Sequence, residues 1–364
     1  MTALQAGARI GILGGGQLGR MLSTAAAQLG FDVSIYCPET DCPAARVSRD
    51  HVACDYDDYA AMLAWAETCD VITYEFENVP VEAANALLRA GHLVRPGAKP
   101  LEVSQDRFIE KSFLKGCGIG TADFADIVSS DDIAAPIERF GGRGILKTRR
   151  DGYDGKGQAR LETGDDFEAA HKALGHAPCI LEALIPFACE ISVIVARAVD
   201  GGTRCFDVPR NEHVNGILRR SSLPANLAPD ITARACAAAE SLAAALDYIG
   251  VLALEFFVLE DGRLLANEFA PRVHNSGHWT PEACATGQFE QHIRAVAGWP
   301  LTPVTRFHDV VMENLLGDEA LAPPETFPAD GVLTLYGKRE AKPGRKMGHL
   351  VRRLGVNASL DPES

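Results

Sequence analysis

The chain has 364 residues, of which 47% are hydrophobic and 23% charged, and this length can bury a sizeable core in two or three domains. Its 35 basic and 49 acidic residues give a formal net charge of −14, which argues against nucleic acid or an anionic membrane as the main partner. The ten cysteines include no C-x-x-C pair, and we find no signal peptide or membrane-spanning apolar run. We therefore predict a cytoplasmic enzyme with reduced thiols, without disulfides or cysteine-metal clusters.

The N-terminal segment is typical of a βαβ unit with a glycine-rich first turn. An apolar strand ends at Leu13, a G-x-G-x-x-G turn begins at Gly14, a helix extends to about Leu29, and residues 33–37 form a second strand. Such a turn brings an anion close to backbone N–H groups at the helix N-terminus. Because Glu39 comes later than a dinucleotide site requires, we favour a different phosphate-bearing ligand. Dinucleotide binding and purely structural glycines are the alternatives.

Two glutamates follow the next expected strand, residues 71–74. Glu75 and Glu77 are two positions apart, so in an extended chain they share a face at the carboxyl end of the strand, where open α/β sheets bind ligands. We expect them either to accept hydrogen bonds from a hydroxyl or amine of a ligand, or to cap the helix that follows Pro80.

A glycine-rich loop between two short strands is a candidate phosphate lid. Lys147 lies on the first strand, and the loop Asp151–Gly157 interleaves glycines with Arg149, Arg150 and Lys156 nearby. Glycines leave backbone N–H groups free, and the cationic side chains suit a triphosphate. The loop lacks the G-K-[ST] of a Walker motif, so we expect it to cover the phosphates from above. An ordinary exposed hairpin is the alternative.

The strand 179–181 leads into a candidate nucleoside site. Ile185-Pro186 interrupts strand pairing just after Glu182, and the freed backbone groups suit adenine. Glu190 opens the next strand and could accept hydrogen bonds from ribose hydroxyls. Taken alone, both glutamates would be interpreted as surface residues.

The segments 251–259 and 263–269 predict a hairpin closed by a two-residue Asp261-Gly262 turn. In that register Glu255 faces Glu268, with side chains roughly 5 Å apart, where two like charges repel unless a cation or shared proton lies between them. Hard carboxylate oxygens suit Mg²⁺. A solvated strand face is the alternative.

Several motifs occur in one order along nearly the whole chain: GGGQLGRM, TYEFENVP, SQDRFIEKSFL, LKTRRDGYDGKGQ, EFAPRVHNSGHWT and YGKREAKPGRKMGH. Together they resemble the N5-carboxyaminoimidazole ribonucleotide synthetase family of the ATP-grasp superfamily. The resemblance implies a mixed α/β and α+β fold. Its expected parts are an N-terminal doubly wound, Rossmann-like domain (1–104), an ATP-grasp core of two lobes (105–298) with a mobile lid lobe at about 108–184, and a small C-terminal β domain (299–364).

Carried over motif by motif, the resemblance implies four groups of site residues. The ATP-binding group is Arg107, Lys147, Gly152, Tyr153, Asp154, Gly155, Lys156, Gly157, Gln158, Glu182, Ala183, Leu184, Ile185, Glu190, His213, Asn267 and Glu268. The metal ligands, for Mg²⁺ or Mn²⁺, are Glu255 and Glu268. The catalytic group is Tyr153, Lys156, Arg272, His274, Asn275 and Lys346. The substrate-binding group is Gly16, Gln17, Leu18, Glu75, Asn275, Ser276, Lys338, Arg345, Lys346 and Arg353. Ala270 stands where many ATP-grasp relatives carry Asn, which argues against a third protein metal ligand.

Two polar segments would then serve the second substrate and the intermediate. The segment Arg272–His278 offers a cation, imidazoles, an amide and a hydroxyl for bicarbonate and carboxyphosphate. The basic segment Lys338–Arg353 is interpreted as a clamp for ribose 5-phosphate or carboxyphosphate, with a solvated basic face as the alternative.

The implied reaction is ATP- and bicarbonate-dependent carboxylation of 5-aminoimidazole ribonucleotide to N5-carboxyaminoimidazole ribonucleotide through carboxyphosphate, releasing ADP and phosphate in purine biosynthesis. The implied assembly is a homodimer that passes its product to N5-carboxyaminoimidazole ribonucleotide mutase. Three alternatives stay open: a sister ligase such as formate-dependent glycinamide ribonucleotide transformylase, a nicotinamide-dependent oxidoreductase, and a non-catalytic nucleotide sensor. The sister ligase typically has HDTG where this chain has His274-Asn275-Ser276-Gly277.

Overall fold

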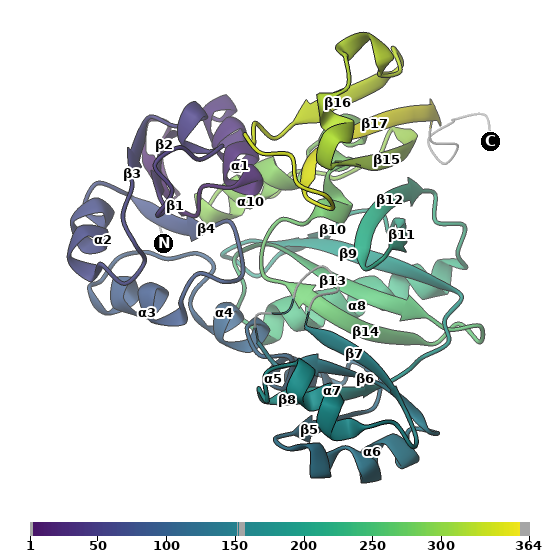
Figure 1. Cartoon of the computed structure of the whole chain (residues 1–364). Helices are drawn as coiled ribbons and strands as arrows, with labels where there is room; N and C mark the ends of the chain where they lie inside the picture. Colours follow the sequence, from purple (N-terminus) through teal and green to yellow (C-terminus); the bar gives the residue numbers. More distant parts are fainter. Residues whose placement is uncertain (1–2, 151, 153–156, 357–364) are drawn as a thin grey trace.

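The computed structural model describes residues 3–150, 152 and 157–356 (Figure 1). The N-terminal elements are β1 (Arg9–Leu13), α1 (Gln17–Gln28), β2 (Asp32–Tyr36), β3 (Asp50–Val52), α2 (Tyr59–Ala66), β4 (Val71–Tyr74), α3 (Val81–Arg89) and α4 (Lys99–Ser104). The strands form a parallel sheet in the order β3-β2-β1-β4. Ile10 and Ile12 join the core beneath α1, whereas Leu13 joins the core beneath α2 and α3, as alternation along a strand requires. The sheet is therefore covered on both faces.

The lobe at the bottom of Figure 1 is a small antiparallel sheet with two short helices. It contains β5 (Phe124–Ile127), α6 (Ala134–Arg139), β6 (Arg143–Thr148), β7 (Gln158–Glu162), α7 (Phe167–Ala173) and β8 (Cys179–Ala183), and α5 (Arg107–Gly116) leads into it. The strand order is β5-β8-β6-β7. Its core is small and separate, built on Ile127, Ile137, Leu146 and Leu161.

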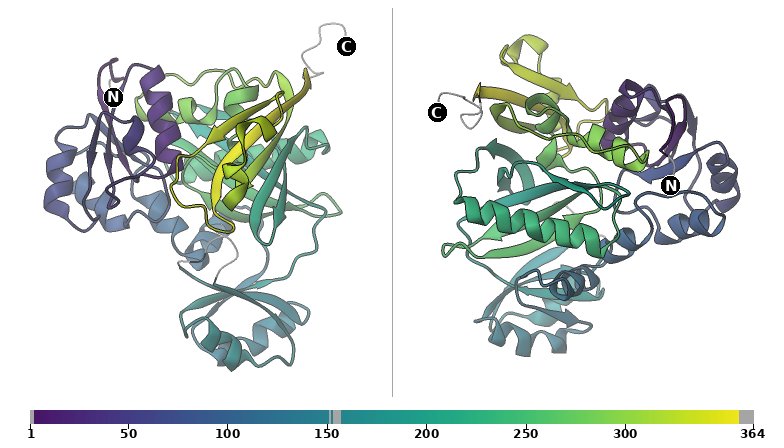
Figure 2. Two further views of the ribbon diagram at one scale, coloured as in Figure 1. Left: turned by 45° about the horizontal axis from the view of Figure 1, so that its top comes forward. Right: turned by 180° about the vertical axis from the view of Figure 1, so that it is seen from behind.

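A larger antiparallel sheet forms the centre of the molecule. The strands of this sheet are β9 (Cys189–Arg197), β10 (Thr203–Cys205), β11 (Arg210–Val214), β12 (Ile217–Leu223), β13 (Gly250–Val258), β14 (Leu264–Ala270), β15 (His308–Leu316), β16 (Gly331–Leu335) and β17 (Lys346–Val356). The helices of this part of the chain are α8 (Pro229–Ala245), α9 (Thr280–Ala283) and α10 (Gln288–Val296). Figure 2 shows α8 lying across one face, while α10 packs on the other and also against α1. β15 pairs with β12, so the C-terminal strands continue this sheet and do not form a sheet of their own. No helix in the described part of the chain is long and apolar enough to cross a membrane.

The hairpin β13–β14 differs from the expected one at its turn. Leu259 N donates to Arg263 O, which leaves a three-residue loop with Gly262 at φ 78°, so the two-residue turn expected from the sequence is wrong. The register near the turn is therefore shifted by one residue. A bulge between Leu254 and Phe256 then reverses the shift, because one residue of β13 opposes two of β14 at that point. Glu255 consequently lies opposite Asn267 and Glu268, and the two carboxylates remain neighbours.

Candidate functional site

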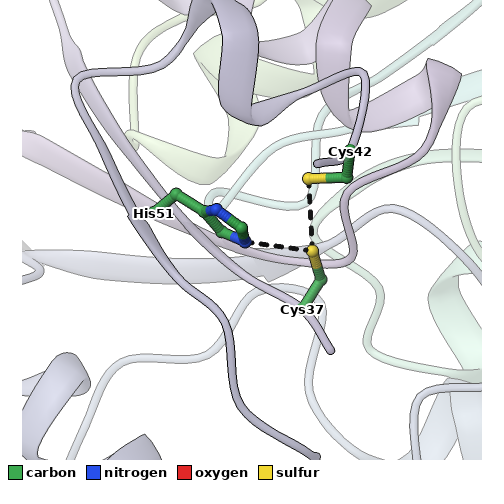
Figure 3. A group of neighbouring side chains, drawn as sticks. All are labelled: Cys37, Cys42 and His51. Carbon is green, nitrogen blue, oxygen red and sulfur yellow. Dashed lines mark hydrogen bonds between the residues drawn. The ribbon is translucent and has the colours of Figure 1, made fainter. Parts of the chain in front are cut away.

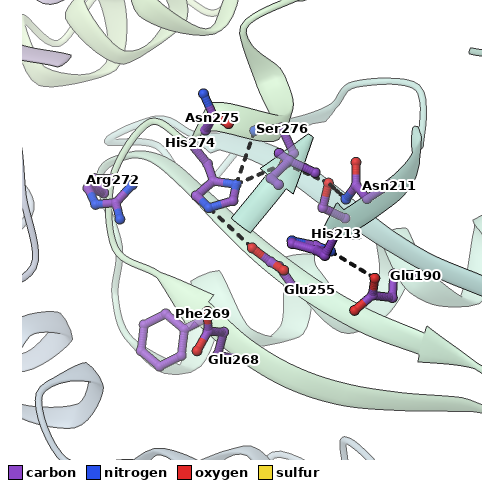
Figure 4. Close-up of polar contacts among 12 residues, drawn as sticks. Glu190, Asn211, His213, Glu255, Glu268, Phe269, Arg272, His274, Asn275 and Ser276 are labelled. Carbon is purple, nitrogen blue, oxygen red and sulfur yellow. Dashed lines mark hydrogen bonds and ion pairs between the residues drawn. The ribbon is translucent and has the colours of Figure 1, made fainter. Parts of the chain in front are cut away.

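The two glutamates of the β13–β14 hairpin belong to a cluster of polar side chains, with Glu255 in its middle and Glu268 at its edge (Figure 4). His274 Nε2 lies 3.1 Å from Glu255 Oε1, and Arg107 Nη1 donates to Glu268 Oε2 at 3.1 Å. Burial and the neighbouring Glu268 raise the pKa of Glu255 to about 7. Burial also opposes ionisation of Glu268, but Arg107 and Lys147 outweigh it and lower its pKa. Adjacent hard oxygens that repel one another fit a divalent cation such as Mg²⁺ or Mn²⁺, which would relieve this repulsion.

Cations next to this pair are already neutralised by a buried carboxylate. Glu182, which is 3% exposed, forms ion pairs with both lysines: its carboxylate lies 3.0 Å from Lys147 Nζ and 3.1 Å from Lys111 Nζ. Burial alone would raise the pKa of Glu182, but the two lysines hold it at about 2. Glu182 is thus an internal counter-ion and not the surface residue that its sequence position suggested.

Sequence reasoning missed two buried ionisable side chains on α5. Lys111 is 2% exposed, and Glu110 accepts from Phe269 N at 2.7 Å. Burial and the nearby Glu268 raise the pKa of Glu110 to about 8. A signal for them exists: Arg107, Glu110 and Lys111 share the i, i+3, i+4 face that continues to buried Leu114. Charges at the positions that usually bury apolar side chains indicate a polar cavity beneath the helix.

The expected nucleoside and lid residues lie around this cluster. Glu190 on β9 accepts from His213 Nδ1 on β11 at 2.8 Å, and this bond raises the pKa of His213 although burial opposes it. Leu184 is exposed, and Ala183 and Ile185 are half-buried, at the end of β8. Arg107 Nη2 donates to Gly152 O at 2.8 Å, which ties the lid to α5. Five residues of the expected lid lie outside the described residues: Asp151, Tyr153, Asp154, Gly155 and Lys156.

The end of the lid that the structure describes explains one glycine. Gly157 has φ 69°, and a Cβ there would lie 2.8 Å from Thr148 Oγ1. A larger residue would be strained in both backbone and contacts. Gln158 follows at the start of β7, where it pairs with Lys147 of β6. The described end of the glycine-rich loop thus lies beside the strand that carries Lys147.

The segment after β14 connects the carboxylate pair to a second site. Arg272 forms an ion pair with Glu77, with Nη2 donating to Oε1 at 2.9 Å. His274 contacts Ser276 Oγ at 2.8 Å on the side of its ring opposite Glu255. Burial and the charge of Arg272 keep the pKa of His274 well below its usual value, so the imidazole is neutral. Asn275 exchanges side-chain hydrogen bonds with Asn314 at 2.8 and 2.6 Å.

A cavity of about 750 Å³ opens beside this segment, and its lining comes from the N-terminal domain (within 15–78), from 272–275 and from the C-terminal segment 337–346. The expected site residues among its lining are Gly16, Gln17, Leu18, Glu75, Arg272, His274, Asn275, Lys338, Arg345 and Lys346. Sequence reasoning did not single out Arg46, which also lines the cavity and donates to Gly337 O at 2.6 Å. Two expected substrate residues lie elsewhere. Ser276 is fully buried and bonded to Ser192, and Arg353 is exposed on β17, where it contacts Glu282.

Glu75 has a role that the sequence did not predict. Its carboxylate accepts from Gly16 N at 2.7 Å and from Gly19 N at 2.9 Å, at the start of α1. These are the donors that the glycine-rich turn was expected to present to a phosphate, so at these two groups the protein supplies its own anion. Glu75 therefore caps α1. This contact is neither the hydrogen bond to a ligand nor the cap of the helix after Pro80 that the sequence predicted for Glu75. Burial raises its pKa.

Comparisons with known proteins agree with this geometry. The ribonucleotide synthetase preATP-grasp domain matches residues 7–105, the ATP-grasp domain matches residues 112–289, and the phosphoribosylaminoimidazole carboxylase C-terminal domain matches residues 310–353. The N5-carboxyaminoimidazole ribonucleotide synthase of Brucella melitensis is 53% identical over 96% of this chain and 98% of its own length.

Solved structures give the same result. The N5-carboxyaminoimidazole ribonucleotide synthetase of Thermus thermophilus aligns with a TM-score of 0.88 at 42% identity, covering 94% of this chain and 93% of that one. The Aspergillus clavatus N5-carboxyaminoimidazole synthase, solved with ADP and 5-aminoimidazole ribonucleotide, aligns with a TM-score of 0.89 at 31% identity, covering 96% and 94%. The fold class expected from the sequence is confirmed. The chain belongs to the N5-carboxyaminoimidazole ribonucleotide synthase family of ATP-grasp enzymes.

Proposed function

We propose that ATP and 5-aminoimidazole ribonucleotide bind at the two ends of one cleft, with the carboxylate pair between them. As a member of its family, the chain is an ATP-dependent ligase that carboxylates 5-aminoimidazole ribonucleotide in purine biosynthesis. One observation carries the proposed arrangement: His274 contacts Glu255 of the carboxylate pair and also lines the 750 Å³ cavity. A group formed at the γ-phosphate therefore has a short path to an amine held in the cavity.

In the proposed reaction an oxygen of bicarbonate attacks the γ-phosphorus of ATP, the bond to ADP breaks, and carboxyphosphate forms. The exocyclic amine of the ribonucleotide then takes up the carboxyl group, directly or after CO₂ is released within the site, and phosphate leaves. When held by Glu255 and Glu268, Mg²⁺ or Mn²⁺ supplies positive charge at the phosphate oxygens.

The side chains divide into those that serve ATP and those that serve carboxyl transfer. Arg107 and Lys147 bind the phosphates by exchanging their contacts with Glu268 and Glu182 for phosphate oxygens. Arg272, fixed by Glu77, holds bicarbonate and carboxyphosphate next to the neutral His274. Asn275 and Lys346 border the same space. Tyr153 and Lys156 are assigned to the lid that excludes water, on the family pattern alone.

The substrate assignment is tested by ATP turnover in four mixtures: ATP alone, with bicarbonate, with the ribonucleotide, and with both. The proposal expects stoichiometric ADP, phosphate and N5-carboxyaminoimidazole ribonucleotide only in the complete mixture. Formate with glycinamide ribonucleotide serves as the control for the sister ligase. Greater turnover with that pair would replace the proposed substrates.

Four further statements belong to this proposal. The domain limits at 104 and 298 are supported by the three matched ranges. A reducing, cytoplasmic location is supported by ten free cysteines. A homodimer and transfer of the product to N5-carboxyaminoimidazole ribonucleotide mutase rest on the family resemblance. Sedimentation velocity tests the homodimer, and a coupled assay with the purified mutase tests the transfer of the product.

A further inference from the structure

Two thiols and an imidazole lie together (Figure 3) beside the ribonucleotide cavity, and Cys42 is the member of this group that lines the cavity. Cys37 follows β2, Cys42 lies on the loop after it, and His51 lies on β3. The two sulfurs are 3.2 Å apart, and His51 Nε2 is 3.4 Å from Cys37 Sγ. All three ligand atoms lie within 4.8 Å of one another, and among the described residues this is the one group of three such side chains close enough to share an ion.

Several contacts hold this group in place. Cys37 and Cys42 are buried, and a Cβ on Gly15 would lie 2.5 and 2.3 Å from their sulfurs, so the backbone of the glycine-rich turn packs directly on both. Ala44 N donates to Gly15 O at 3.0 Å from the far end of the loop. The thiol of Cys37 donates to Cys42 Sγ, and this bond lowers the pKa of Cys42 to about 7. The group is thus a fixed feature beside the cavity.

The distances fit a tetrahedral ion better than a disulfide. Zn–S bonds of about 2.3 Å and a Zn–N bond of about 2.0 Å at tetrahedral angles place the sulfurs about 3.8 Å apart and sulfur and nitrogen about 3.5 Å apart. The two sulfurs would need to separate by roughly half an ångström, whereas a disulfide of about 2.05 Å requires them to approach by more than 1 Å. The backbone O of Glu39 lies 3.5 Å from Cys37 Sγ, and the fourth position of the ion is left to water.

We propose that Cys37, Cys42 and His51 form a binding site for a thiophilic divalent cation, Zn²⁺ in the first instance, beside the ribonucleotide cavity. This replaces the expectation, based on the absence of a C-x-x-C pair, that the cysteines bind no metal. The ion cross-links the end of β2, the Pro38–Pro43 loop and β3. Cys42, Glu39 and Asp41 line the cavity, so the occupied site fixes one of its walls.

The experiment uses the full-length, reduced protein, which is first freed of metal and then given excess Mg²⁺. The Mg²⁺ occupies the glutamate pair, so that this pair does not contribute to Zn²⁺ binding. Equilibrium dialysis against Zn²⁺ should give one ion per chain. Titration with Co²⁺ should give the near-ultraviolet sulfur-to-cobalt charge-transfer absorption, which carboxylate sites lack. Both readouts are independent of catalysis.

Three variants locate the site. Cys42→Ser and His51→Asn should each lose stoichiometric Zn²⁺ binding. His51 is half-buried, so its replacement tests the site even if the buried serine impairs folding. Cys236→Ser is the matched control, because Cys205 and Cys236 form another close thiol pair, on β10 and α8. Unchanged stoichiometry in His51→Asn, loss of the ion in Cys236→Ser, or absence of the cobalt-sulfur absorption in the wild type would overturn the proposal.

Discussion

The two ends of the cleft hold their positive charges in different ways. At the nucleotide end, Arg107, Lys111 and Lys147 are paired with carboxylates of the sheet strands β8 and β14. At the ribonucleotide cavity, Arg46 pairs with the exposed carboxylate of Asp41 and also donates to Gly337 O, while Arg345 donates to Glu340 O. The positive charges of the nucleotide end are thus neutralised by carboxylates on packed strands. The cavity, in contrast, forms only where segments distant in sequence meet. Mutations should therefore impair catalysis or stability at the first end and substrate affinity at the second.

The largest effect is expected at the carboxylate pair. Replacement of either partner, Glu255→Gln or Glu268→Gln, should lower kcat for ATP turnover by at least about a hundredfold, because metal-based charge stabilisation contributes several kcal/mol. The melting temperature should change little. The double variant should be no worse than the poorer single one, since the two residues act as a unit.

Glu260→Gln is the matched control for this prediction. Glu260 is exposed in the loop of the same hairpin, and its replacement should leave turnover unchanged. Near-normal activity of Glu268→Gln at ordinary magnesium concentrations would contradict the metal assignment.

The next effect concerns stability at the nucleotide end. Glu182→Gln leaves Lys111 and Lys147 without their shared counter-ion, and breaking a buried ion pair costs about 3 kcal/mol or more. Urea denaturation at pH 7 should show this loss in the free energy of unfolding. Glu162→Gln is the matched control, because Glu162 is exposed on β7.

The same carboxylate gives a pH dependence with a definite sign. Its pKa is about 2 in the folded chain and close to 4.5 when unfolded, so its contribution is complete above about pH 5 and is lost as the pH falls towards 2. Wild type should lose more stability across this window than Glu182→Gln. Parallel stability curves for the two proteins would show that Glu182 is not the charged partner of the lysines.

The smallest of these effects is expected at the cavity. Arg345→Ala should raise KM for 5-aminoimidazole ribonucleotide by about tenfold to a hundredfold, because a charge-assisted phosphate contact contributes about 1.5–3 kcal/mol. The Kd for ATP should stay near the wild-type value. Lys342→Ala is the control, since Lys342 lies on the same segment but outside the cavity lining. Lost ATP affinity with an unchanged ribonucleotide KM would place this segment at the nucleotide end instead.

The sequence predicted local pairs better than contacts between distant elements. Glu255 and Glu268 were correctly placed as neighbours, although the three-residue loop and the bulge that together produce this pairing were not foreseen. The lysine partners of Glu182 could not be predicted, because Lys111 reaches it only when α5 docks beside β8. For the same reason, the capping of α1 by Glu75 depends on β1 and β4 being neighbours in the sheet.

In the proposed reaction, ATP activates bicarbonate at one end of the cleft and the carboxyl group is captured at the other. The most direct measurement is complete turnover with ¹⁸O-labelled bicarbonate, followed by mass analysis of the phosphate released. Attack of a bicarbonate oxygen on the γ-phosphorus predicts that each phosphate carries one ¹⁸O, because that oxygen stays on phosphorus when the carboxyl group is transferred. Phosphate without ¹⁸O, formed together with N5-carboxyaminoimidazole ribonucleotide, would contradict carboxyphosphate formation and the account built on it.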